Sequence, residues 1–330
     1  MLEIKNVYAN GSGGALCGVE TAMDGKGIFG IIGAHKGDLA LLADLICGCR
    51  DAEKGSVELN GQPLSRGNSE TRRRVRLVPE RLKLTPSTTA VEYLDFVGDV
   101  FRIDSEKKYR LIKESMEFVG LEGKGSVSFD RLGSGDRFRL SLAAALIGNP
   151  ECIVVANSVS QVSPAEVSSV YDVLKTLGKI KTVILLTSSA SLAKKLCSRV
   201  DLMCGGRIVL SGGVDEIEKK INATREINLT VRGSVDAIVS AIKEKVEGVI
   251  EVTVGTEGAN SVNTLTVECR PDTKMKDKLY SALAEINAPM LSYREIVLTL
   301  DDVFFSLTAS DKQREEQGAK KNSKKMRNGK

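Results

Sequence analysis

The sequence predicts an α/β domain at residues 1–222, a smaller α+β domain at 226–308 and a disordered basic tail at 309–330. Three observations lead to this division. A strand-like run, a short turn and a helix-like run follow one another at residues 26–47. After Ile221 the pattern changes to short alternating strands separated by two amphipathic helices. The final residues contain almost no apolar side chains, a composition typical of disorder.

The first pair of elements has the layout of a phosphate-binding loop. Residues 26–33, KGIFGIIG, form the strand-like run, and residues 39–47, LALLADLIC, form the helix-like run. A short polar turn joins them. In a P-loop, backbone N–H groups of the turn and of the helix N-terminus hold phosphate oxygens. The first domain is therefore predicted to be an α/β domain of the P-loop NTPase type.

The residues that do chemistry in such a loop are altered. A P-loop reads G-x-x-x-x-G-K-[ST]. Counted from Gly33, the second glycine is Asp38, the lysine is Leu39 and the hydroxyl residue is Ala40. Leu39 offers no cation to a phosphate, Ala40 offers no oxygen to Mg²⁺, and Asp38 brings a negative charge to the place that phosphate would approach. The altered loop comprises Gly33, His35, Lys36, Gly37, Asp38, Leu39 and Ala40.

Two polar residues of this loop have alternative interpretations. Lys36 stands three residues before the place of the lysine, so it is either a weak substitute cation or an exposed side chain. His35 is the only histidine of the chain. Because no acid–base partner for it is visible in the sequence, we expect an exposed polar loop residue.

Six segments in order resemble the ATP-binding subunit of an ATP-binding-cassette (ABC) transporter, with near-family spacing over about two-thirds of the chain. One of them, LVPERLKLTPSTTAVEYLDFVGDVFRI, is similar to the segment that holds the family's Q-loop, with Glu80 at the Q-loop position. The resemblance implies a helical subdomain at about 82–150. The six segments are residues 1–7, 33–40, 45–64, 77–103, 131–164 and 182–212.

Set against the family pattern, the catalytic positions are also altered. The resemblance places the Walker B aspartate at Ala156, the glutamate beside it at Asn157 and the switch histidine at Ser188. ATP and Mg²⁺ are the cofactors that the family implies. Phosphoryl transfer needs a lysine, a metal ion and a positioned water together, so we expect no catalytic residue and no metal site here. Glu80, with no metal-holding aspartate nearby, is expected to be a surface or hinge residue.

The family's signature motif, which acts on the nucleotide of a partner subunit, is altered too. It corresponds to Leu132-Gly133-Ser134-Gly135-Asp136, followed by a helix expected at 137–148. One interpretation is an ordinary helix N-terminus capped by Ser134 or Asp136. The other is a surviving contact in which backbone N–H groups face an anion held by the partner.

The second domain reads as strand, helix, strand, strand, helix, strand, an order that predicts a ferredoxin-like sandwich. A short closing helix is expected at 298–308, LTLDDVFFSLT. This ending is similar to that of the accessory domain on the ATPase subunits of exporters whose membrane subunit is a separate polypeptide. The six elements are expected at 226–232, 234–246, 249–254, 263–270, 276–287 and 290–298.

Charge and composition limit the partners. Residues 312–330 hold eight Lys/Arg and two acidic residues, while the whole chain carries +4. The basic tail is either a solvated segment or a contact for anionic lipid. Aromatic residues make up 4% and Trp is absent, which disfavours nucleic-acid binding by stacking. The sequence has no long apolar run and no signal peptide, and its seven cysteines lack metal-site spacing.

Together these features predict a catalytically silent nucleotide-binding subunit of an ABC export complex. It would lie in the cytoplasm at the inner face of the cell membrane and act with a membrane permease. Its second partner would be a competent ATPase subunit in a heterodimer, or another copy in a homodimer. Two alternatives remain: a weak ATPase that binds nucleotide through backbone groups and Lys36, and a soluble adaptor derived from such a subunit. The transported substrate would be chosen by the membrane subunit.

Overall fold

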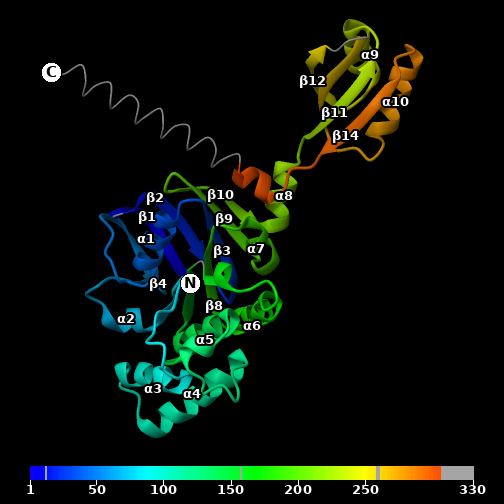
Figure 1. Ribbon diagram of the computed structural model, residues 1–330. Coiled ribbons are helices and arrows are strands. Elements are labelled where there is room, and N and C mark those ends of the chain that lie inside the picture. The colour runs from blue at the N-terminus through cyan, green and yellow to red at the C-terminus, as the bar shows by residue number, and fades with distance from the viewer. Residues whose placement is uncertain (12, 157, 258–260, 306–330) are drawn as a thin grey trace, which may run out of the picture. The chain divides into compact units, whose positions relative to one another are not determined.

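The computed structural model describes residues 1–11, 13–156, 158–257 and 261–305. The described chain forms two compact units (Figure 1). The larger unit comprises residues 1–214 with 304 and 305, and the smaller comprises residues 215–303. In the described part of the chain, no helix combines the length and the apolar character needed to cross a membrane.

The larger unit contains two sheets. The four-stranded antiparallel sheet has the order β2-β1-β4-β5, and the six-stranded sheet has the order β10-β9-β3-β8-β7-β6. In the second sheet all neighbours are parallel except β10, which pairs antiparallel with β9. The strands are β1 (Leu2–Gly11), β2 (Gly14–Met23), β3 (Gly27–Gly33), β4 (Lys54–Leu59), β5 (Gln62–Pro63), β6 (Val75–Val78), β7 (Cys152–Ala156), β8 (Thr182–Thr187), β9 (Arg199–Cys204) and β10 (Arg207–Gly213).

Helix α1 (Lys36–Ile46) joins the two sheets into one core. It contacts β1 and β2 on one side and β3, β7 and β8 on the other. Its side chains at Leu42 and Ile46 are fully buried, as are Ile31 and Val154 on the central strands. A parallel sheet covered on both faces requires such continuous apolar strands, which explains the uninterrupted run that predicted β3.

The segment expected as a helical subdomain contains three helices that pack on one another: α3 (Ala90–Val100), α4 (Ser105–Val119) and α5 (Ser134–Leu146) (Figure 1). Local sequence explains where the first two begin. Thr89 and Glu92 form a reciprocal capping box at α3. The Asp104 carboxylate accepts the Glu106 N–H at the start of α4. The remaining helices of the larger unit are α2 (Ser69–Arg73), η1 (Phe129–Arg131), η2 (Ser158–Gln161), α6 (Val167–Ile180) and α7 (Ala190–Leu196).

The smaller unit has the predicted ferredoxin-like order. Its antiparallel sheet runs β12-β13-β11-β14, and the buried sides of the strands pack with α9 and α10 in one apolar cluster. Alternation of buried and exposed residues along β11 accounts for its recognition from sequence. The elements are β11 (Arg225–Arg232), α9 (Val235–Lys245), β12 (Val249–Glu257), β13 (Val262–Cys269), α10 (Met275–Glu285) and β14 (Met290–Ile296).

The ends of this unit differ in detail from the expected boundaries. Helix α8 (Val214–Ile221) precedes β11, and the smaller unit begins within it at Asp215. Residues 300–305 are helical, inside the closing helix expected at 298–308. The basic tail at 309–330 lies outside the described residues.

Candidate functional site

The carboxyl ends of three neighbouring parallel strands define the candidate site. Strands β3, β8 and β7 are adjacent in the sheet and end at Gly33, Thr187 and Ala156. In open α/β sheets, ligands bind outside the carboxyl ends of the strands. This edge of the sheet therefore carries three positions that the family resemblance selected: the loop that starts at Gly33, Ala156, and Ser188 just after β8.

A small cavity of about 170 Å³ lies at this edge. Leu39 and Ala40 of α1 line it, together with Ala156 at the end of β7 and Leu186 of β8. Charged side chains contribute at Lys36, Asp44 and Glu80. The remaining lining residues are Ala43, Leu77 and Pro79. Most of the lining is apolar. Ala40 and Ala156 supply neither the hydroxyl nor the carboxylate that hold Mg²⁺ in a P-loop enzyme, so this donor set does not fit that magnesium site.

Helix α1 begins earlier than the sequence predicted. It starts at Lys36, three residues before the expected Leu39, and only Ala34 and His35 separate it from β3. The Leu39 N–H donates to the His35 carbonyl at 3.3 Å, so it already belongs to the helical hydrogen-bond pattern. An acidic residue in the first turn is favourable for a helix, and Asp38 supplies it. The backbone that would arch around a phosphate is thus partly helical.

The Asp38 carboxylate is buried at the N-terminus of α1. Its Oδ1 accepts the Ala15 N–H at 2.8 Å and lies 2.9 Å from His35 Nδ1. Only 7% of Asp38 is exposed. The sequence analysis did not identify this partner of His35, which lies only three residues further on at the same helix end. The His35 side chain itself is largely exposed, as expected.

The turn between β1 and β2 lies directly against this helix end. A Cβ atom added at Gly37 would stand 1.4 Å from the Gly13 carbonyl oxygen, and one added at Gly14 would stand 2.4 Å from the Gly37 carbonyl carbon. Only glycine allows two backbones to approach so closely. The β1–β2 turn therefore covers the first turn of α1, a contact that the sequence analysis missed.

Lys36 and Glu80 form an ion pair beside the cavity. Lys36 Nζ lies 3.4 Å from Glu80 Oε1, and the Lys36 side chain is 66% exposed. The pair joins the start of α1 to the loop that follows β6. Lys36 thus points to a carboxylate of the chain itself.

At the altered signature motif, a carboxylate from another segment faces the start of α5. Glu166 Oε2 accepts the Gly135 N–H at 3.1 Å and the hydroxyls of Ser134 and Ser163 at 2.9 and 2.6 Å. These donors, led by the Ser163 hydroxyl, lower the pKa of Glu166 below its usual range. Sequence reasoning missed Glu166, which precedes α6 and has no motif around it.

Two details of the signature prediction are wrong. Helix α5 begins at Ser134, three residues before the expected start, and its N-cap is Gly133, which has no side chain to cap with. Ser134 is instead hydrogen-bonded to Glu166 and Ser163, and Asp136 pairs with Lys124 at 2.5 Å. Neither residue caps the helix, because each has a tertiary partner.

The remaining predicted positions are placed as follows. Ala156 ends β7 and faces the cavity, while Asn157 lies outside the described residues. Ser188 follows β8 directly, and the next residue, Ser189, caps α7 by accepting the Leu192 N–H at 3.2 Å.

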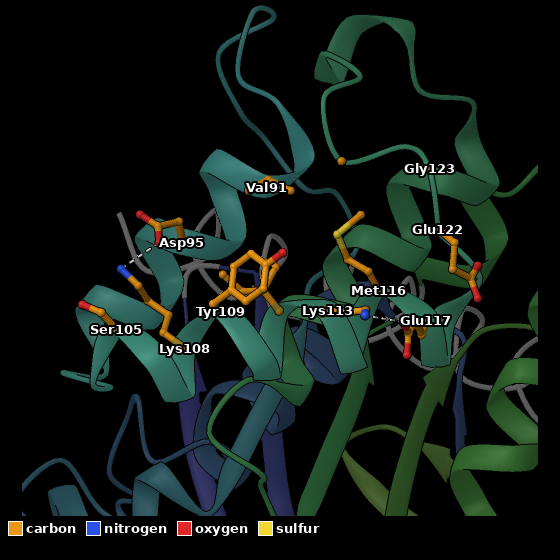
Figure 2. Close-up of a pocket in the computed structure, with 12 residues that line it drawn as sticks. Val91, Asp95, Ser105, Lys108, Tyr109, Lys113, Met116, Glu117, Glu122 and Gly123 are labelled. Atoms are coloured by element: carbon orange, nitrogen blue, oxygen red, sulfur yellow. Dashed lines mark ion pairs between the residues drawn. The ribbon is translucent and has the colours of Figure 1, made fainter.

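A second concavity lies in the helical segment, between α3, α4 and the loop after α4 (Figure 2). Its volume is about 590 Å³ and its lining is mainly apolar. Figure 2 shows Tyr109 of α4 beneath Val91 of α3, with Met116 further along α4. At one end, Lys108 pairs with Asp95 at 2.7 Å. We call this surface the α3–α4 groove. The sequence analysis did not predict it.

Comparison with known proteins shows which family the larger unit is similar to. Residues 27–156 match a family model described as ABC transporter. The methionine import ATP-binding protein MetN of Geobacillus kaustophilus is 28% identical over 220 residues, 64% of this chain and 64% of that protein. The linearmycin resistance ATP-binding protein LnrL of Bacillus subtilis is 22% identical over 245 residues, 74% of this chain and 79% of that protein. The match thus spans less than two-thirds of the length of the methionine import relative.

Solved structures agree on the fold. A nucleotide-free ATP-binding cassette from an ABC transporter has a TM-score of 0.60 at 18% identity, over 67% of this chain and 95% of that chain. CbiO1 from Clostridium perfringens, part of the ABC transporter complex cbiONQ, has a TM-score of 0.57 at 20% identity, over 67% of this chain and 94% of that chain. The predicted P-loop fold is confirmed. Residues 27–156 thus match the ABC transporter family model, and the larger unit has the fold of ABC transporter ATP-binding domains.

Proposed function

We propose that this chain is a catalytically silent ATP-binding-domain subunit of an ABC export complex. The observation that carries the proposal is the composition of the cavity at the ends of β3 and β7. Where an ATPase of this fold needs a lysine, a hydroxyl and a carboxylate, the cavity offers Leu39, Ala40 and Ala156. Removing one preorganised group costs roughly a hundredfold or more in rate, and here three are replaced at once.

The role that remains is structural. The α3–α4 groove supports docking of a helix from a membrane permease, since its lining is mainly apolar and includes the exposed side chain of Tyr109. Grooves of this kind bind the apolar face of an amphipathic helix. The chain would then hold the permease at the cytoplasmic face of the membrane, and the basic tail would contact anionic lipid.

A competent ATPase subunit is the partner that supplies the energy. A homodimer of this chain would combine two sites with the same replacements and would perform no power stroke. The geometry at α5 argues against a contact between the signature motif of this chain and the nucleotide of that partner. The Gly135 N–H, which would face the partner's nucleotide, already donates to Glu166 at 3.1 Å.

The direction of transport is part of the proposal. The ferredoxin-like second domain and the ending at 298–308 resemble the exporter branch of the family, and this resemblance favours export.

An ATPase assay together with membrane co-purification tests the proposal. The purified chain should hydrolyse no Mg-ATP above the buffer rate, and the chain from its own cell membranes should co-purify with a hydrophobic subunit. Saturable hydrolysis by the chain alone would favour the weak-ATPase alternative. Recovery only from the soluble fraction would favour the adaptor.

A further inference from the structure

We infer that the chain closes its own phosphate position: the Asp38 carboxylate and the β1–β2 turn together occupy the helix end where a P-loop holds phosphate. This inference rests on the proposed function and adds a cause of silence besides the missing catalytic residues. It assigns an autoinhibitory contact to residues 13–15 and 37–38.

The first step of the argument concerns charge. The N-terminus of a helix attracts an anion because its first N–H groups have no partner within the helix. At α1 the Asp38 carboxylate lies in the first turn, where its negative charge repels a second anion. Asp38 is 7% exposed, so the anion is held inside the protein and does not extend into solvent.

The second step concerns space. The Gly13 carbonyl oxygen lies close enough to Gly37 that even a methyl group would stand 1.4 Å from it. The turn therefore packs against the backbone of the first turn of α1, the segment whose N–H groups hold phosphate in a P-loop.

The third step concerns the hydrogen bond that links the charge of Asp38 to the position of the turn. Asp38 fastens the turn to the helix, since its Oδ1 accepts the Ala15 N–H at 2.8 Å. A hydrogen bond to a charged group is among the stronger ones in proteins. The carboxylate thus acts twice, as the anion at the helix end and as the link that keeps the turn in place.

The main test restores the missing catalytic side chains in two variants, one that keeps Asp38 and one that lacks it. One variant carries Leu39→Lys, Ala40→Ser, Ala156→Asp and Asn157→Glu, and the other adds Asp38→Gly. Mg-ATP binding to each is measured by calorimetry. The variant that keeps Asp38 should show no saturable binding up to millimolar ATP. The variant with Asp38→Gly should bind Mg-ATP with a Kd at least tenfold below millimolar.

Two results would overturn the inference. If both variants bind equally well, Asp38 does not close the site, although the silence of the wild type would still stand. If neither folded variant binds Mg-ATP, removal of the Asp38 carboxylate does not open the site to phosphate, and the inference also fails. Binding by the unmodified chain would instead defeat the proposed function, so the two failures are distinguishable.

A single substitution tests the same contact without new charges in the cavity. Hydrogen exchange of the Ala15 amide is compared in the wild type, in Asp38→Ser and in Asp44→Ala, which removes a carboxylate from an exposed position further along α1. Asp38→Ser should exchange about tenfold faster or more, with Asp44→Ala unchanged. Equal exchange in all three proteins would show that Asp38 does not hold the turn.

Discussion

Asp38 Oδ1 accepts a hydrogen bond from the Ala15 N–H at 2.8 Å, across 23 positions of the chain. This bond joins the first turn of α1 to the start of β2. In the P-loop frame, the same helix end would face phosphate. The hydrogen bond between these two residues therefore lies at the helix end that would bind nucleotide in a P-loop.

The close approach of Gly37 to the β1–β2 turn predicts a stability effect. Gly37→Ala should lower the free energy of unfolding by about 2 kcal/mol or more, because the new methyl group overlaps the Gly13 carbonyl oxygen. Urea denaturation followed by circular dichroism measures it. Gly67→Ala is the matched control, since a Cβ at Gly67 meets no atom within 4 Å. Equal midpoints for the two variants would refute the contact.

The Glu166 network predicts a pH dependence. Because the pKa of Glu166 is lowered from its usual 4.5, its stabilising effect is present above pH 4.5 and is lost as the pH falls through the folded value. Glu166→Gln should therefore unfold more easily than wild type at pH 7, by about 1 kcal/mol, and the difference should shrink below pH 4.5.

Thermal unfolding between pH 3 and pH 8 measures this difference. Glu114→Gln is the control, because Glu114 lies exposed on α4 at 3.8 Å from Arg110 and its replacement should change stability little. A Glu166→Gln effect that is constant across the whole range would contradict the network.

Two neighbouring cysteines should differ sharply in reactivity. Burial raises the pKa of the Cys47 thiol, while Cys49, two residues further on, is exposed. The thiolate is the reactive form, so iodoacetamide at pH 8 should label Cys49 and spare Cys47 in the native protein. Burial likewise raises the pKa of Cys152 to about 12. Mass spectrometry locates the label, and modification of Cys47 before unfolding would show that this end of α1 is open.

The α3–α4 groove predicts a selective loss of membrane association. Tyr109→Asp places a charge on the apolar lining at a residue that is 74% exposed, so folding should be preserved while binding to the permease falls at least tenfold. Tyr280→Asp, at a tyrosine 63% exposed on α10, is the control. Co-sedimentation with membranes compares the two. Equal membrane association would remove the groove as the docking surface.

Local patterns were enough to predict the frame of this protein. The apolar run of β3 and the alternation of β11 each depend on a repeat along a single segment, and the structure confirms both. The first residues of α1 and α5 were predicted wrongly, because the groups that contact these helix ends come from distant positions in the sequence. Ala15 precedes Asp38 by 23 residues, and Glu166 follows Gly135 by 31.

Only part of the candidate site could be predicted, because sequence motifs identify local positions and do not identify contacts between distant segments. Leu39, Ala40 and Ala156 were located by their spacing in family motifs, and they do line one cavity. Neither the covering turn at Gly13 nor the α3–α4 groove has a sequence motif. Both arise only when separate segments pack together.

Mg-ATP binding to the unmodified, purified chain tests the central claim most directly. Calorimetry at protein concentrations near 50 times a micromolar Kd (roughly 50 μM protein) would detect such binding easily. The account predicts no saturable heat up to millimolar ATP, which corresponds to a binding free energy no better than about −4 kcal/mol. Saturable binding in the micromolar range would contradict it and would show that the chain holds nucleotide despite Leu39, Ala40 and Asp38.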